Sequence, residues 1–174
     1  AYYEWELNPT VSGFIMGDGA TVTINWINSF TGDAYLKVKA INGCGESEFS
    51  DSLLVTVSEL PMAFNLMGGG SFCEGDEGVE ISQDGSEAGV DYELWKDGEP
   101  TAIIVEGTGE AISFGTIAEA GEYVSLGTSP VTTCSIEMNN TAVVAPIALP
   151  MAYTTTGGGG FCDGSEGVEI GLDG

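Results

Sequence analysis

Four cysteines are the residues best suited to covalent chemistry in this 174-residue chain. Cys44, Cys73, Cys134 and Cys162 are far apart in the sequence and form no CxxC pair, and histidine is absent, so zinc-knuckle spacing is missing. An even number of isolated cysteines in a strand-rich chain favours two disulfides over buried free thiols. We therefore expect half-cystines at these positions and an oxidising location, at the cell surface or outside the cell.

Carboxylates dominate the remaining chemistry. The chain has 27 Asp and Glu against three Lys, with no Arg and no His, for a formal net charge of -24. Such a field repels phosphate backbones and anionic lipids, so neither nucleic-acid binding nor bilayer docking is expected. Membrane insertion is not expected either, because the sequence has no run of about 18 apolar residues. Two carboxylates suffice for a glycosidase, but the chain lacks the His, Arg or spare Cys that most catalytic sites use. We expect a solvated acidic face and no enzyme.

A smaller set of acidic residues includes candidate ligands for one metal ion, calcium. Glu74, Asp76, Glu77, Asp163 and Glu166 lie in predicted loops just after cysteines, and hard oxygen ligands suit Ca²⁺. No EF-hand or glycine-rich nonapeptide spacing accompanies them, and Asp-Gly turns explain the same residues. No cofactor is therefore expected, with calcium as the alternative.

Aromatic and glycine-rich segments are two further candidates for ligand sites. Trp95 is out of phase with the apolar positions of its strand and is the candidate for an exposed glycan contact, whereas Trp5 and Trp26 fit a core. The glycine runs 68–70 and 157–160 are followed by no Lys-Ser/Thr pair, so they do not predict a phosphate loop. Close backbone packing or a flexible domain entry explains them better.

Short segments with period-two alternation, separated by Gly, Asp and Asn, must position these residues. Seven strands are predicted between residues 61 and 150: 79–83, 90–96, 102–106, 111–115, 121–127, 131–138 and 141–147. Five more are predicted before residue 60: 2–7, 11–15, 20–26, 34–42 and 53–58. Seven strands in about 90 residues are typical of an antiparallel β-sandwich, whereas five are too few for the same sandwich.

An internal repeat explains why residues 1–60 have too few strands for a complete sandwich. Residues 149–174 match residues 60–85 at 17 of 26 positions with an offset of 89 and no gap. Aligning Tyr3 with Tyr92 makes residues 1–60 the back part of a domain that lacks its first strands. Residues 61–150 then form a complete domain, and residues 151–174 are the front strands of a next domain.

The repeat also predicts the cysteine pairs. Cys73 and Cys134 are 61 residues apart within the complete domain, and Cys162 and Cys44 are 56 apart when residue 174 is joined to residue 1. We therefore predict Cys73–Cys134 and Cys44–Cys162 disulfides. Because a short linker holds residues 151–174 away from residues 1–60, the second pair is expected between neighbouring molecules, unless the chain is a window from a longer tandem protein or has frayed ends.

Several motifs resemble a known family. Tyr3, Trp5, Trp26, the turn at residues 42–47 and the closing Leu-x-Val-x-Val strand are similar to the PKD-like, immunoglobulin-like repeat domains of large secreted surface proteins of Bacteroidota. The resemblance implies a β-sandwich fold, export from the cell, and roles in adhesion, gliding or filaments. Asp51-Ser52-Leu53 also resembles an O-glycosylation site of such proteins, with Ser52 as the acceptor.

The sequence thus predicts an all-β protein of tandem immunoglobulin-like sandwiches, the first completed by strands from a following unit. We expect a structural subunit of an extracellular fibre that assembles with copies of itself, head to tail, by strand complementation and disulfides. The alternative is an adhesin or carbohydrate-binding module of a larger secreted protein, with surface glycans as partners.

Overall fold

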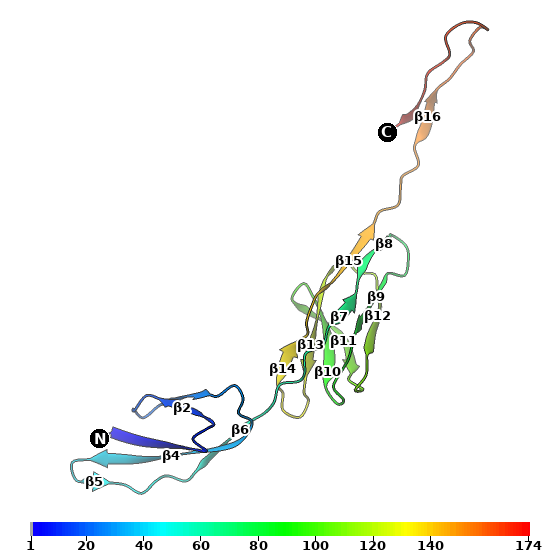
Figure 1. Cartoon of the computed structure of the whole chain (residues 1–174). Coiled ribbons are helices and arrows are strands. Elements are labelled where there is room, and N and C mark those ends of the chain that lie inside the picture. Colours follow the sequence, from blue (N-terminus) through cyan, green and yellow to red (C-terminus); the bar gives the residue numbers. More distant parts are fainter. Residues whose placement is uncertain (1) are drawn as a thin grey trace.

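The computed structural model describes residues 2–174, and this part of the chain is all strand and loop. Figure 1 shows three successive parts: an N-terminal unit (residues 2–60), a middle unit (61–150) and a projecting C-terminal hairpin (151–174). The hairpin and the N-terminal unit lie on opposite sides of the middle unit. None of the described residues forms a helix that could span a membrane.

Two sheets make up the middle unit. The larger sheet has the order β11-β10-β13-β15-β8, with β14 also paired to β13, and the smaller has the order β12-β9-β7. All pairs are antiparallel except β15 with β8. Their bounds are β7 Leu66–Gly68, β8 Gly70–Cys73, β9 Val79–Gln83, β10 Asp91–Lys96, β11 Glu99–Glu106, β12 Ile112–Ile117, β13 Gly121–Thr128, β14 Ser135–Glu137 and β15 Ala142–Ile147.

The core of the middle unit lies between these sheets, because alternate residues of each strand point inward. Ile81, Tyr92 and Leu94 have no exposed surface, and residues of both sheets belong to the same apolar cluster. One polar pair is buried with them: the Ser125 hydroxyl donates to Gln83 Oε1 at 3.1 Å, and Gln83 Nε2 donates to the Gly85 carbonyl at 2.7 Å. The middle unit is therefore β-sandwich-like, with its inward-facing groups packed or hydrogen-bonded.

The N-terminal unit has a thinner core. Strand β4 (Gly32–Asn42) pairs with β1 (Tyr2–Asn8), β5 (Gly45–Glu46) and β6 (Leu53–Val57), while β2 (Gly13–Met16) pairs only with β3 (Thr23–Trp26). Among residues 2–60, only Leu7, Ala34 and Leu36 form a buried apolar cluster. Trp5, Ile24 and Trp26 pack on it while remaining partly exposed.

Lysines and glutamates are paired across the first sheet. Register places Glu4 opposite Lys39 and Glu6 opposite Lys37, and the ammonium-carboxylate distances are 3.2 Å in both pairs. Hydrogen bonds from Lys39 to Glu46 and then Glu4 raise the pKa of its ammonium group above the ordinary value. The remaining lysine, Lys96, pairs with Glu119.

Most predicted strands are confirmed, and β9 has the predicted bounds. The predicted strand 131–138 is shortened to β14 because residues 129–134 form a turn in which Ser129 N–H donates to the Cys134 carbonyl. The strands β5, β7 and β8 were not predicted. Glycines interrupt β7 and β8, so neither has an alternating run long enough to recognise.

Replacing Ile81 by Ala should destabilise the middle unit by about 2–5 kcal/mol, because its side chain is fully buried and leaves a cavity. Ile170 occupies the same repeat position and is 69% exposed, so Ile170→Ala should change the stability of the monomer by less than about 0.5 kcal/mol. Denaturant titration at low protein concentration measures both. Equal losses would contradict the burial difference.

Asp84 should make the stability of the middle unit depend on acid pH. The Asn65 backbone N–H donates to its carboxylate at 2.8 Å and the Asn65 side-chain amide at 2.7 Å, and these bonds lower the Asp84 pKa below its ordinary value. A lowered folded-state pKa adds stability above the unfolded pKa, near 3.8, that is lost as pH falls through the folded value. The free-energy difference between wild type and Asp84→Asn should therefore shrink as pH falls from 6 to 2. A constant difference would show that the carboxylate charge contributes nothing.

Candidate functional site

The C-terminal hairpin has the same backbone structure as the first hairpin of the middle unit. Strand β16 (Thr154–Gly157) pairs with β17 (Ile170–Asp173) so that Gly157 faces Ile170, and in the middle unit Gly68 faces Ile81, 89 residues earlier. Gly158 N–H donates to the Glu169 carbonyl at 3.1 Å, and Gly69 N–H donates to Glu80 at 3.0 Å. The two hairpins are therefore one structural element used twice.

Glycine is required at the matching positions. Gly68 and Gly157 both have positive φ, and a Cβ atom on either would lie 2.1 Å from a carbonyl oxygen of the opposite strand. A Cβ on Gly85 would meet the Phe64 ring, and one on Gly174 would meet the Tyr153 ring. The glycine runs thus allow the close strand approach that the sequence indicated.

What differs is the covering of the apolar face. Ile81 is fully buried by the second sheet, whereas Ile170 is 69% exposed. Gln83 is also fully buried, and its counterpart Leu172 is 67% exposed. The C-terminal hairpin therefore presents an ordered strand pair whose inward side has no partner among the described residues.

The N-terminal unit shows the complementary arrangement. In the middle unit β10, β13 and β15 form the centre of the large sheet, and β1, β4 and β6 repeat their pairing in the N-terminal unit. The outer edge of β15 bonds to β8, and β12 bonds to β9. Residues 2–60 contain no counterparts of β7, β8 and β9, so the corresponding edges of β6 and β3 are unpaired within the described chain.

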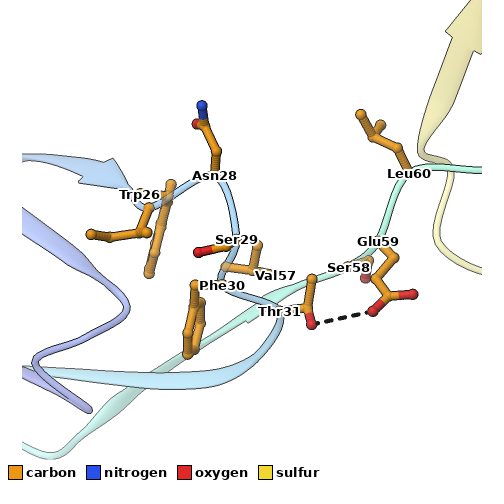
Figure 2. Close-up of a pocket in the computed structure, with 10 residues that line it drawn as sticks. Trp26, Asn28, Ser29, Phe30, Thr31, Val57, Ser58, Glu59 and Leu60 are labelled. Carbon is orange, nitrogen blue, oxygen red and sulfur yellow. Dashed lines mark hydrogen bonds between the residues drawn. The ribbon is translucent and has the colours of Figure 1, made fainter.

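A hollow lined by both apolar and polar side chains lies where β6 ends and the linker to the middle unit begins. Figure 2 shows the rings of Trp26 and Phe30 on one side and the segment from Val57 to Leu60 on the other, with Thr31 donating to Glu59 Oε1 at 3.5 Å. The hollow has a volume of about 540 Å³. The Trp26 and Phe30 rings are stacked with centroids 6.4 Å apart. The sequence predicted strand addition to residues 1–60, but it did not predict the hollow as a site.

The structure places the predicted cysteines at opposite ends of the units. Cys73 is level with Ile147 at the end of the middle unit nearest the C-terminal hairpin, and Cys134 lies in the turn after Thr128 at the other end. About eleven strand residues separate them, or roughly 35 Å, whereas a disulfide needs Cα atoms within about 7 Å. The predicted Cys73–Cys134 bridge therefore does not fit this fold, and no two of the four cysteines are bonded to each other within the described chain.

Cys44 and Cys162, the other predicted pair, do not meet within one chain. Cys44 lies in the turn between β4 and β5, and Cys162 lies in the loop of the C-terminal hairpin, on the far side of the middle unit. Both are exposed. A bridge between them in the same molecule is thus ruled out by this geometry, in line with the expectation that any such pair is intermolecular.

The remaining site candidates stay apart. Glu74, Asp76 and Glu77 lie in the loop after β8, Asp163 and Glu166 lie in the matching loop of the hairpin, and no group of three or more potential ligands converges among residues 2–174. Trp95 is half-buried, and its indole N–H donates to Glu93 Oε2 at 3.0 Å, so it is less exposed than predicted. Ser52 is exposed just before β6, where it is accessible to modification.

Hydrogen exchange of the dilute protein should distinguish the two hairpins. Amide hydrogens of β9 should exchange only on unfolding of the middle unit, because strands bond to it on both sides. Amide hydrogens of β17 should exchange much faster than those of β9. Strand β17 bonds only to β16, and no second layer covers it. Mass spectrometry of peptic peptides reports both strands in one experiment. Equal protection at low concentration would contradict an uncovered hairpin.

No protein-family model, curated protein or solved structure matches this chain. The chain can instead be compared with itself. The middle unit contains both a hairpin like that of residues 151–174 and a sheet like that of residues 2–60.

Proposed function

We propose that the protein is a structural subunit of an extracellular fibre, in which the C-terminal hairpin of one molecule completes the N-terminal unit of the next. The proposal depends on one observation. The chain exposes a preformed hairpin at one end and an open sheet at the other, and in the middle unit the equivalent hairpin and sheet pack together in one core. A donor hairpin and an acceptor sheet on opposite sides of one molecule form a head-to-tail contact that does not close on itself.

The repeat predicts how the strands dock. In the middle unit, β12 pairs with β9 and β15 runs parallel to β8. Transferred to the joint, β17 lies antiparallel to β3 of the acceptor, and residues 159–162 run parallel to β6. The completed unit then has the same two layers as the middle unit, and the joint supports an immunoglobulin-like sandwich in both.

The hollow of the N-terminal unit accepts a specific side chain in this register. Phe72 on β8 faces Pro146 and packs against the middle core. Its repeat counterpart is Phe161, and the counterpart of Pro146 is Val57, which lines the hollow with Trp26 and Phe30. We assign Phe161 of the donor to this hollow, where its ring leaves water and meets two aromatic rings.

A second pair of facing residues is polar in the middle core and apolar at the proposed joint. Leu94 faces Ser125 across β10 and β13, and Trp5 faces Val38 in the equivalent position of β1 and β4. Ser125 hydrogen-bonds to Gln83, so the joint would set Leu172 against Val38 in place of Gln83 against Ser125. A polar pair in one core thus corresponds to an apolar pair in the other, as matched partners require.

Wild-type protein kept under reducing conditions should form linear oligomers as its concentration rises, with an axial repeat of two units in electron micrographs. Leu172→Gln should weaken assembly roughly ten- to a hundredfold, because it places an amide without a partner against Val38. Ile104→Gln should have no effect, since its side chain is 58% exposed on the edge strand β11 of the middle unit, away from both junctions. Sedimentation velocity at several concentrations gives the apparent association constants.

The decisive variant combines Leu172→Gln with Val38→Ser, which rebuilds the Gln83–Ser125 pair at the joint. Assembly should recover by about tenfold or more relative to Leu172→Gln alone. If the double variant did not recover assembly, the proposed strand register would be wrong. If the wild-type protein stayed monomeric at every concentration, the fibre proposal would be wrong, and residues 151–174 would have a different role.

A further inference from the structure

We infer that the cysteines form bridges across the junctions between units, joining Cys73 to Cys44 of the next molecule and Cys162 to Cys134 of the next molecule. The inference rests on the proposed head-to-tail contact and replaces pairing within units, which the strand register rules out for Cys73 and Cys134. Both bridges would be intermolecular, so each joint would be fastened twice.

The positions of the cysteines follow a simple rule. Each unit has one cysteine position at its leading end, where the strand that pairs parallel to the last strand ends. It has a second at its trailing end, in the turn after the long central strand. Cys73 occupies the leading end of the middle unit and Cys134 its trailing end. Cys44 occupies the trailing end of the N-terminal unit, beyond Asn42 of β4.

Docking of the hairpin supplies the missing leading-end cysteine. The parallel register of β8 with β15 places Cys73 opposite Ile147, and the repeat then places Cys162 opposite Ser58 of the acceptor. Ser58 is two residues before Leu60 of the Leu60-Pro61 junction. Cys162 would therefore lie where the completed unit meets the middle unit of the acceptor molecule.

Cys134 reaches the same junction from the other side. Asn139 N–H donates to the Phe64 carbonyl, and the segment from Met138 back to Cys134 runs toward the trailing end, as does the linker from Phe64 back to Leu60. Four extended residues cover roughly 13 Å, so both segments reach a similar level. Cys162 and Cys134 thus approach the junction from its two sides, within roughly 10 Å along the strand direction.

The other joint repeats this geometry. Cys73 lies level with Ile147, which is two residues before Leu149 of the Leu149-Pro150 junction, where the completed unit begins. The trailing end of that completed unit contains Cys44 of the acceptor. Matching junction sequences and matching cysteine levels therefore give two equivalent bridges.

Bridge formation is a two-electron oxidation. Each pair of thiols loses two protons and two electrons as its sulfur-sulfur bond forms, and the disulfide of oxidised glutathione accepts them to give two glutathione thiols. Exposure of Cys44, Cys73 and Cys162, and partial exposure of Cys134, allow this exchange.

Two double variants separate the pairing schemes after assembly and treatment with oxidised glutathione. Cys73→Ser with Cys134→Ser removes one partner from each junction bridge, so the ladder on a non-reducing gel should vanish, whereas pairing within units would retain a Cys44–Cys162 ladder. Cys44→Ser with Cys73→Ser removes one bridge only, so the ladder should persist, whereas pairing within units would abolish it. A glutamate-specific protease cleaves between Cys44 and Cys73 and between Cys134 and Cys162, so its peptides of the wild type should contain the 73–44 and 162–134 links.

Sedimentation of the same variants under reducing conditions is the control. Both should assemble as wild type does, because the proposed strand contact needs no disulfide. Reversed gel results, peptides with 73–134 links, or normal assembly without any ladder would overturn the bridges while leaving the strand contact intact. Loss of assembly in reductant would instead count against the proposed function.

Discussion

A β-sheet with an apolar face is stable in water only when a second layer covers that face. The middle unit satisfies this constraint within itself, because β12, β9 and β7 lie over the sheet that contains β10 and β13. The flanking segments each hold one part of the same arrangement and leave large side chains in solvent. Burial of Ile170 and Leu172 alone would be worth roughly 1.5–3 kcal/mol for each side chain, so covering the hairpin is strongly favoured.

The constraint also explains the different strand pairing of the two units. In the middle unit β11 pairs with β10 and β12 with β9, whereas in the N-terminal unit the equivalent strands β2 and β3 pair with each other. A strand without its neighbour still has to satisfy its backbone groups, and the adjacent strand is the partner within reach. The free edge of β3 remains available for β17.

The sequence predicted the strands well where alternation was long and regular, as in β1, β9, β10 and β13. It also identified the hairpin as a repeat, since 17 of 26 residues are identical to the earlier copy. It did not reveal β7 or β8, because glycines there carry the structure through backbone freedom rather than side-chain pattern. The hollow at Trp26 and Phe30 was not predicted for a different reason: it is formed by residues 26–31 and 57–60, which are 26 to 34 residues apart in the chain. Counting residues between cysteines suggested pairs within units, but it ignored direction along the strands, and the register of β13, β14 and β15 puts those cysteines at opposite ends.

All three lysines are held by glutamates: Lys37 by Glu6, Lys39 by Glu4 and Glu46, and Lys96 by Glu119. No cation of the described side chains is left to contact a neighbouring filament. The proposed fibre would be a linear polyanion, and two parallel filaments would repel each other along their whole length until counterions screened them. In such a fibre, the ion pairs within each subunit would favour growth at the ends over lateral bundling.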